Sequence, residues 1–220
     1  MPEGTTMRAY NFLLVVCLCA VGGLTPAWSQ DTTATAELPT VYSDLAAVYY
    51  YGGGVTRIHT WINTGGTGFR YSGSNGWFST NKGGYEADRL VKVACGDFDG
   101  NGLDDLAGFY YYGNGKTVIH VWLNHGQNRF EYKGSAGWWR EEAGYDATKL
   151  VGVAAGDYNG DGFDDLCGFY NYGAGKVHIH VWLSNGVSAF KYQGSDGWWK
   201  ANTGYEAEGI KHILGGEFAR

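Results

Sequence analysis

The feature that most constrains the fold of this chain is an internal repeat of about 60 residues. The segment at 96–102 reads GDFDGNG and recurs at 156–162 as GDYNGDG. A Gly-Trp pair, an Ile-His-x-Trp segment and a Gly-Tyr-acidic-Ala segment each occur three times, in the same order. A fixed period of this length indicates stacked copies of one structural unit. We therefore predict about three copies, at residues 44–104, 105–164 and 165–220.

Each copy has the pattern of four short strands joined by tight turns. In the middle copy the strands are expected at residues 90–95, 105–112, 117–123 and 130–133. A longer loop at 134–148 carries paired tryptophans to the next copy. Within the third strand, Ile119 and Val121 should face one side of the sheet, and His120 the other. Four antiparallel strands per repeat are typical of a β-propeller blade, so the predicted fold is all-β, a partial or open propeller.

Composition agrees with short strands and many turns. Glycine accounts for 37 of the 220 residues, aromatic residues for 16% and charged residues for 17%. Disordered chains carry few aromatic residues, and helical bundles are rich in Ala, Glu, Lys and Leu, so neither class fits. The net charge of −6 argues against nucleic acid and anionic membranes as main partners, because both select clustered Lys and Arg.

The amino terminus has the features of a secretory signal peptide. Arg8 precedes an apolar stretch, and Ala27-Trp28-Ser29 is typical of a cleavage site. We predict a signal peptide at 1–29 and a linker at 30–43, with no membrane span after cleavage; an uncleaved anchor is the alternative. The protein would then be extracellular, periplasmic or at the cell surface. After cleavage two cysteines remain, which we expect to be small buried thiols rather than a disulfide: Cys95 and Cys167.

The repeated Asp/Asn/Gly segments predict cation-binding loops between the first and second strands of a copy. Oxygen-bearing groups stand at alternate positions of each loop, one of them a backbone carbonyl. Ca²⁺ takes about 6–8 oxygen ligands in flexible geometry, whereas a cage without His or Cys disfavours zinc. An acidic turn without metal is the alternative. Two calcium ions are expected, the first held by Asp97, Asp99, Asn101, Leu103 and Asp105, the second by Asp157, Asn159, Asp161, Phe163 and Asp165.

The full pattern, G-D-[FY]-[DN]-G-[DN]-G-x-D-D-[LI]-x-G-[FY], resembles the FG-GAP or VCBS repeat, the blade unit of integrin-α-type propellers. The resemblance spans about residues 44–220 and implies calcium in both loops, where the ions stiffen the blades. It also implies an extracellular binding or adhesion module, or an appendage of a carbohydrate-active enzyme. The first copy lacks the acidic loop, and the last stops where a third loop would begin. Closed propellers have about 4–8 blades, so we expect a truncated product, an open arc or a protomer that closes by self-assembly.

The sequence favours binding over catalysis. No G-x-S-x-G nucleophile motif is present, and calcium accounts for most of the loop carboxylates, so no catalytic residue is assigned. The recurring His59, His120 and His180 are expected to pack within the fold. The expected function is a secreted, calcium-binding, non-catalytic module for glycans or extracellular proteins. The alternatives are an adhesion module and an accessory or fragment domain of a carbohydrate-active enzyme. Candidate ligand-binding rings, for which packing between blades is the alternative, are Trp77, Trp138, Trp139, Trp198 and Trp199.

Overall fold

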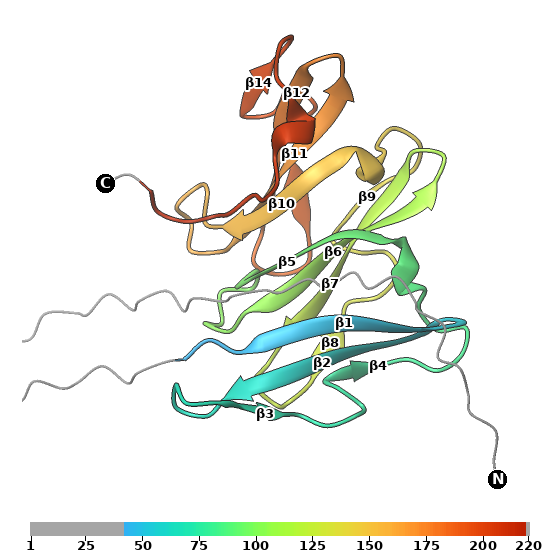
Figure 1. Cartoon of the computed structure of the whole chain (residues 1–220), viewed down its shortest axis with the longest axis vertical. Coiled ribbons are helices and arrows are strands. Elements are labelled where there is room, and N and C mark those ends of the chain that lie inside the picture. The colour runs from blue at the N-terminus through green and yellow to red at the C-terminus, as the bar shows by residue number, and fades with distance from the viewer. Residues whose placement is uncertain (1–41, 219–220) are drawn as a thin grey trace, which may run out of the picture.

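A computed structural model describes residues 42–218, and in them the chain forms three antiparallel sheets stacked in sequence order (Figure 1). We call these sheets blade 1, blade 2 and blade 3. Blade 1 contains β1 (Leu45–Gly52), β2 (Val55–Asn63), β3 (Phe69–Tyr71) and β4 (Phe78–Ser79). Blade 2 contains β5 (Leu90–Gly96), β6 (Asp105–Gly113), β7 (Lys116–Asn124), β8 (Phe130–Tyr132) and β9 (Trp139–Glu141). Blade 3 contains β10 (Leu150–Gly156), β11 (Asp165–Gly173), β12 (Lys176–Ser184), β13 (Phe190–Tyr192) and β14 (Trp199–Ala201).

The all-β, blade-like fold predicted from the repeat is confirmed, and the three sheets do not close into a ring. Helical structure in the described residues is limited to three single turns of 3-10 helix: η1 (Ala87–Arg89), η2 (Ala147–Lys149) and η3 (Ala207–Gly209). None of these is long or apolar enough to cross a membrane. The predicted signal peptide and nearly all of the predicted linker lie outside the described residues.

The prediction of a loop at 134–148 is wrong in part, because this segment contains the strand β9. The outer edge of the nine-residue β7 is shared by two short strands. β8 pairs with the end of β7 at Trp122–Asn124, and β9 pairs with the beginning at Thr117–Ile119. Blade 3 repeats this arrangement with β13 and β14 along β12. The fourth strand of each blade is therefore split in two by the Gly-Trp turn.

Aromatic and aliphatic side chains between adjacent blades form the core. One buried cluster joins blades 1 and 2 around Ile58, Trp122 and Phe130. A second joins blades 2 and 3 and includes Ile119 and Val121. Neighbouring positions of β7 thus serve opposite interfaces, as the predicted alternation requires. Cys95 and Cys167 are not joined by a disulfide, and each is half-buried rather than fully buried.

Candidate metal centre

The loop between β5 and β6 brings three carboxylates together. One oxygen from each of Asp97, Asp99 and Asp105 lies within 4.8 Å of the others, and no other such group of acidic, His or Cys side chains occurs in residues 42–218. Asp105 is the first residue of β6 and is completely buried. The sheet therefore fixes one carboxylate at the base of the loop, and the turn brings the other two to it.

Hydrogen bonds within the loop turn alternate side chains inward. The Asp97 carboxylate accepts from the backbone N–H groups of Asn101 and Gly102, at 2.9 and 2.7 Å. The Asn101 side-chain oxygen accepts from the N–H of Leu103 at 2.8 Å. These bonds are those of an Asx-type turn, in which a short polar side chain holds the backbone two or more residues further on.

The buried Asp105 carboxylate is held by neutral partners. Its Oδ1 accepts from the backbone N–H of Asn124 at 2.7 Å, and its Oδ2 accepts from that of Phe98 at 3.1 Å. Burial raises the pKa of Asp105 to about 8, and the negative charges of Asp99 and Asp97 add to this increase. A cation between the three carboxylates would lower the pKa of Asp105 again, because an opposite charge nearby favours the ionised form.

The donor atoms fit a hard divalent cation. The positions predicted to bind it offer carboxylate, amide and backbone carbonyl oxygens and no nitrogen or sulfur ligand. Ca²⁺ prefers oxygen ligands of this kind, and zinc sites use His and Cys. The residues present therefore fit calcium.

The loop between β10 and β11 repeats the same turn. Asp157 accepts from the N–H of Gly162 at 3.0 Å, and Asp161 accepts from that of Phe163 at 3.0 Å. Asp165 is completely buried, and burial raises its pKa to about 6. The Asn159 side-chain amide donates to Asp161 at 2.8 Å, so these two side chains bond to each other.

The first loop also connects blade 2 to blade 3. Asp97 and Asp164 exchange two hydrogen bonds of 2.9 Å, one from the Asp97 N–H to the Asp164 carboxylate and one from the Asp164 N–H to the Asp97 carbonyl. The Ser184 hydroxyl donates to the Phe98 carbonyl at 2.8 Å. The sequence reasoning missed Asp164 and Ser184. Each acidic loop ends in two consecutive aspartates, and the predicted ligand sets use only the second of them. The repeated first aspartate, Asp164 in the second loop, was therefore the feature of the sequence that could have indicated a further role.

The five candidate tryptophans fall into two groups. Trp77 packs on Phe130 of the next blade, and the 5%-exposed Trp138 packs on Phe190, with ring centroids 5.5 and 5.4 Å apart. Trp139 packs between blades in the same way, against Trp182 and Tyr192. By contrast, the exposed fractions of Trp198 and Trp199 are 51% and 43%.

The recurring histidines pack within the fold. His120 and His180 are each 1% exposed, and His59 is also buried. The Tyr85 hydroxyl lies 2.7 Å from Nδ1 of His120, and the Tyr145 hydroxyl lies 3.0 Å from Nδ1 of His180. Each of these two pairs joins consecutive blades.

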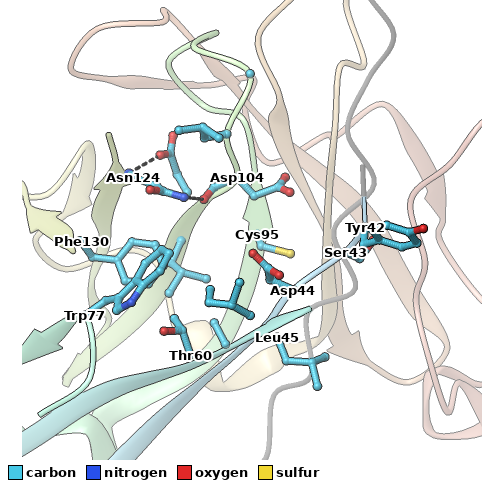
Figure 2. Close-up of a pocket in the computed structure, with 16 residues that line it drawn as sticks. Tyr42, Ser43, Asp44, Leu45, Thr60, Trp77, Cys95, Asp104, Asn124 and Phe130 are labelled. Atoms are coloured by element: carbon cyan, nitrogen blue, oxygen red, sulfur yellow. Dashed lines mark hydrogen bonds between the residues drawn. The ribbon is translucent and has the colours of Figure 1, made fainter. Parts of the chain in front are cut away.

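A cavity of about 150 Å³ lies between blades 1 and 2, beside the first loop. Figure 2 shows Trp77 and Phe130 on one side of it, with Asp104 and Asn124 at the loop end. At the next interface Phe98 packs edge-on against Phe190, the repeat equivalent of Phe130.

Comparison with known proteins finds one similarity, and it covers both acidic loops. Residues 97–168 match a family model described as an FG-GAP-like repeat. The matched segment begins at Asp97, contains both acidic loops and ends within β11. No curated protein and no solved structure matches the chain. The part of the chain that is similar to the FG-GAP-like repeat is therefore the part that contains the two candidate metal loops.

Proposed function

We propose that the chain is a secreted, calcium-binding repeat module that binds partners and has no catalytic activity of its own. The observation that carries the proposal is the buried Asp105 carboxylate, which faces Asp97 and Asp99 and is held by two neutral backbone amides. FG-GAP-like repeats are typically extracellular or at the cell surface, which agrees with the predicted signal peptide.

In this proposal each loop holds one calcium ion. Asp97, Asp99, Asn101, Asp105 and the carbonyl of Leu103 hold the first ion. The second is held by Asp157, Asn159, Asp161, Asp165 and the carbonyl of Phe163. Bound calcium supplies positive charge among the carboxylates. Because Asp97 is bonded to Asp164, a first loop fixed in this way also fixes the contact between blades 2 and 3.

Thermal unfolding in calcium, magnesium and EDTA tests this proposal. A ligand that binds only the folded state stabilises it by about 2.7 kcal/mol at a hundred times its Kd. We expect calcium to raise the melting temperature of the wild type and of Asp88→Asn, an exposed carboxylate outside both loops. The increase should be reduced in Asp105→Asn. Equal melting temperatures in excess EDTA and in excess calcium would refute calcium binding.

Export is tested by sequencing the amino terminus of the protein recovered outside the cytoplasm. We expect it to begin at Gln30, directly after the predicted cleavage site. Recovery of the chain only in the cytoplasm, with its amino terminus intact, would contradict secretion.

A second candidate function is ligand binding through Trp198 and Trp199. Their exposure favours it, because open aromatic rings suit sugar faces and apolar protein surfaces. A glycan array and a pull-down from matrix extracts distinguish a glycan from a protein partner. Loss of the signal in Trp198→Ala, but not in Val187→Ala, would support the assignment. No retained glycan or protein would count against it.

A further inference from the structure

The two ends of the described series of blades carry opposite halves of the interface that joins blade to blade. We call Trp198, Trp199 and Tyr205 of blade 3 the tail face. We call His59, Trp61, Phe69 and Tyr71 of blade 1 the head face. Each residue in these faces has an equivalent at the same repeat position in an internal interface.

The internal interfaces show what each face binds. Trp77 and Trp138, the equivalents of Trp198, pack on Phe130 and Phe190 of the following blade. The Phe130 N–H donates to the Trp77 carbonyl at 2.9 Å, and the Phe190 N–H donates to the Trp138 carbonyl at 2.8 Å. The same side-chain and backbone contacts thus occur twice, in the same places.

At the two ends four of these seven residues are exposed: Phe69, Tyr71, Trp198 and Trp199. Phe69, the equivalent of Phe130 and Phe190, is 51% exposed, whereas those two are 8% and 4% exposed. Trp198 is 51% exposed, whereas Trp138 is 5% exposed. In residues 42–218, therefore, no blade precedes the head face and none follows the tail face, although the residue types of both faces fit one.

The segment at 210–216 is a further part of the tail end that lacks a partner among the described strands. It runs beside β10 (Figure 1), where Ile213 lies against Gly152 and Gly215 lies against Ala155. Its repeat position is that of β5 and β10, the first strands of blades 2 and 3. No described strand pairs with it, and Leu214 is 77% exposed where its equivalents Ala94 and Ala154 are 6% and 7% exposed.

Blade 1 has no strand at the first-strand position in the described residues. β6 and β11 each pair on both sides, with a first strand and a third strand. Among the described strands, β1, their equivalent, pairs only with β2 and forms the edge of its sheet. An edge strand presents a row of backbone N–H and C=O groups that an added strand can pair with.

We propose that a second copy of this chain docks head to tail, with its blade 1 following blade 3 of the first copy. The tail face of one copy covers the head face of the other, and residues 210–216 pair antiparallel with β1. The repeat sets the register: Ala94 pairs with Ala107 and Ala154 with Cys167, so Leu214 lies opposite Ala46. This proposal stands on the repeated interfaces and does not depend on calcium.

A second copy accounts for more of the structure than a sugar does. A sugar stacked on Trp198 would leave Leu214 and the edge of β1 uncovered. A second copy would cover Trp198, Leu214 and the edge of β1 together. The contact is heterologous, and contacts of this kind give rings when the rotation closes. Two copies would bring together six blades, which is within the range of about 4–8 found in closed propellers.

Sedimentation analysis of the purified protein, with calcium and with EDTA, tests the assembly. We expect a mass of at least two chains, and a dissociation constant raised roughly tenfold or more by Leu214→Arg. Leu214 is already exposed, so the folded single chain should tolerate this change. Val187→Arg is the matched control, because Val187 is 70% exposed but lies in the loop between β12 and β13. A single-chain mass for the wild type at all concentrations, or association unchanged by Leu214→Arg, would overturn the proposal.

Cross-linking tests the register directly. Directly opposed side chains of antiparallel strands have Cβ atoms about 4.5–5.5 Å apart, close enough for a disulfide after small shifts. Oxidising an equimolar mixture of Ala46→Cys and Leu214→Cys should link one chain of each kind. A mixture of Ala46→Cys and Val187→Cys is the control and should stay unlinked. Linkage in the control alone, or none in either mixture, would contradict the register. A sugar retained by a chain that sediments singly would assign the tail face to glycan binding instead.

Discussion

At the scale of single residues, a buried histidine lies among tyrosines at the same repeat position of blades 2 and 3, as His120 and His180, and blade 3 also buries His178. His120 is faced by the rings of Tyr85, Tyr110, Tyr112 and Tyr132. Burial raises the pKa of Tyr85, Tyr110 and Tyr132, so these three offer no negative charge to an imidazolium at neutral pH. Burial lowers the pKa of His120 to about 4 and that of His180 to about 4. Both imidazoles are therefore neutral at pH 7, and protonating either would place an unpaired charge in the interface between two blades.

The stability of the fold should fall with acidification because of these rings. In the unfolded chain each histidine titrates near its usual pKa of 6.5, so between pH 6.5 and about 4 the unfolded state binds more protons. Each ring then removes up to about 1.4 kcal/mol of stability per pH unit, and the loss is complete below pH 4. Urea denaturation at pH 7 and pH 5 should show a smaller loss for His120→Asn than for the wild type. His125→Asn, at an exposed ring, is the control, and equal losses in all three proteins would contradict this account.

The glycine before each tryptophan pair is a second point at which one residue determines local structure. Gly137 has φ +66°, and a Cβ on it would lie 2.4 Å from the Ile119 carbonyl oxygen, which also accepts from the Trp138 N–H. Gly134 begins the same turn with φ +90° and open space around it. Gly134→Ala should cost about 1–2 kcal/mol for the left-handed backbone alone. Gly137→Ala should cost clearly more, as measured by urea denaturation, and equal costs would contradict the close approach.

At the scale of the element, the sequence predicted the long strands well and the split outer strand only in part. The alternation in β7 and the two-residue turns, such as Asn114-Gly115 with φ of 53° and 76°, are local signals carried by the residues themselves. β9 and β14 contain only three residues each. Their pairing depends on the length of β7 and β12 left open by β8 and β13, which no local pattern records.

The role of an aromatic residue in this fold depends on whether a neighbouring blade covers it. Phe130 is 8% exposed in the interface of blades 1 and 2, and Phe69 is 51% exposed at the equivalent place in blade 1. Phe130→Ala should cost about 3–5 kcal/mol, because it leaves a cavity under Trp77. Phe69→Ala should cost less than about 1 kcal/mol at protein concentrations where single chains predominate. Chemical denaturation of the two variants measures this difference, and equal costs would show that the two positions are packed alike.

At the scale of the whole molecule, the stability of the fold depends on the interfaces between neighbouring blades. Repeat proteins of this kind contact only adjacent units, so each interface contributes separately. The period of the sequence was enough to predict the fold class and the two acidic loops. It could not predict which tryptophans would be covered, because equivalent residues differ only in whether another blade packs against them. Nor could it show that Asp97 and Ser184 would join the first loop to the neighbouring blade, since those contacts cross between repeats.

The two acidic loops lie at positions where a bound ion would affect the packing of the blades. Asp105 and Asp165 are the first residues of β6 and β11, so each candidate metal loop ends where the second strand of a blade begins. The first loop is also bonded to blade 3. The central claim is therefore that calcium binds in these loops and stabilises the stacked blades.

Calorimetric titration of the chelator-treated protein with calcium chloride tests this claim most directly. We predict two bound ions per chain, one lost in Asp105→Asn and the other lost in Asp165→Asn. Heats for the wild type that equal those of dilution, in a protein shown to be folded, would contradict it.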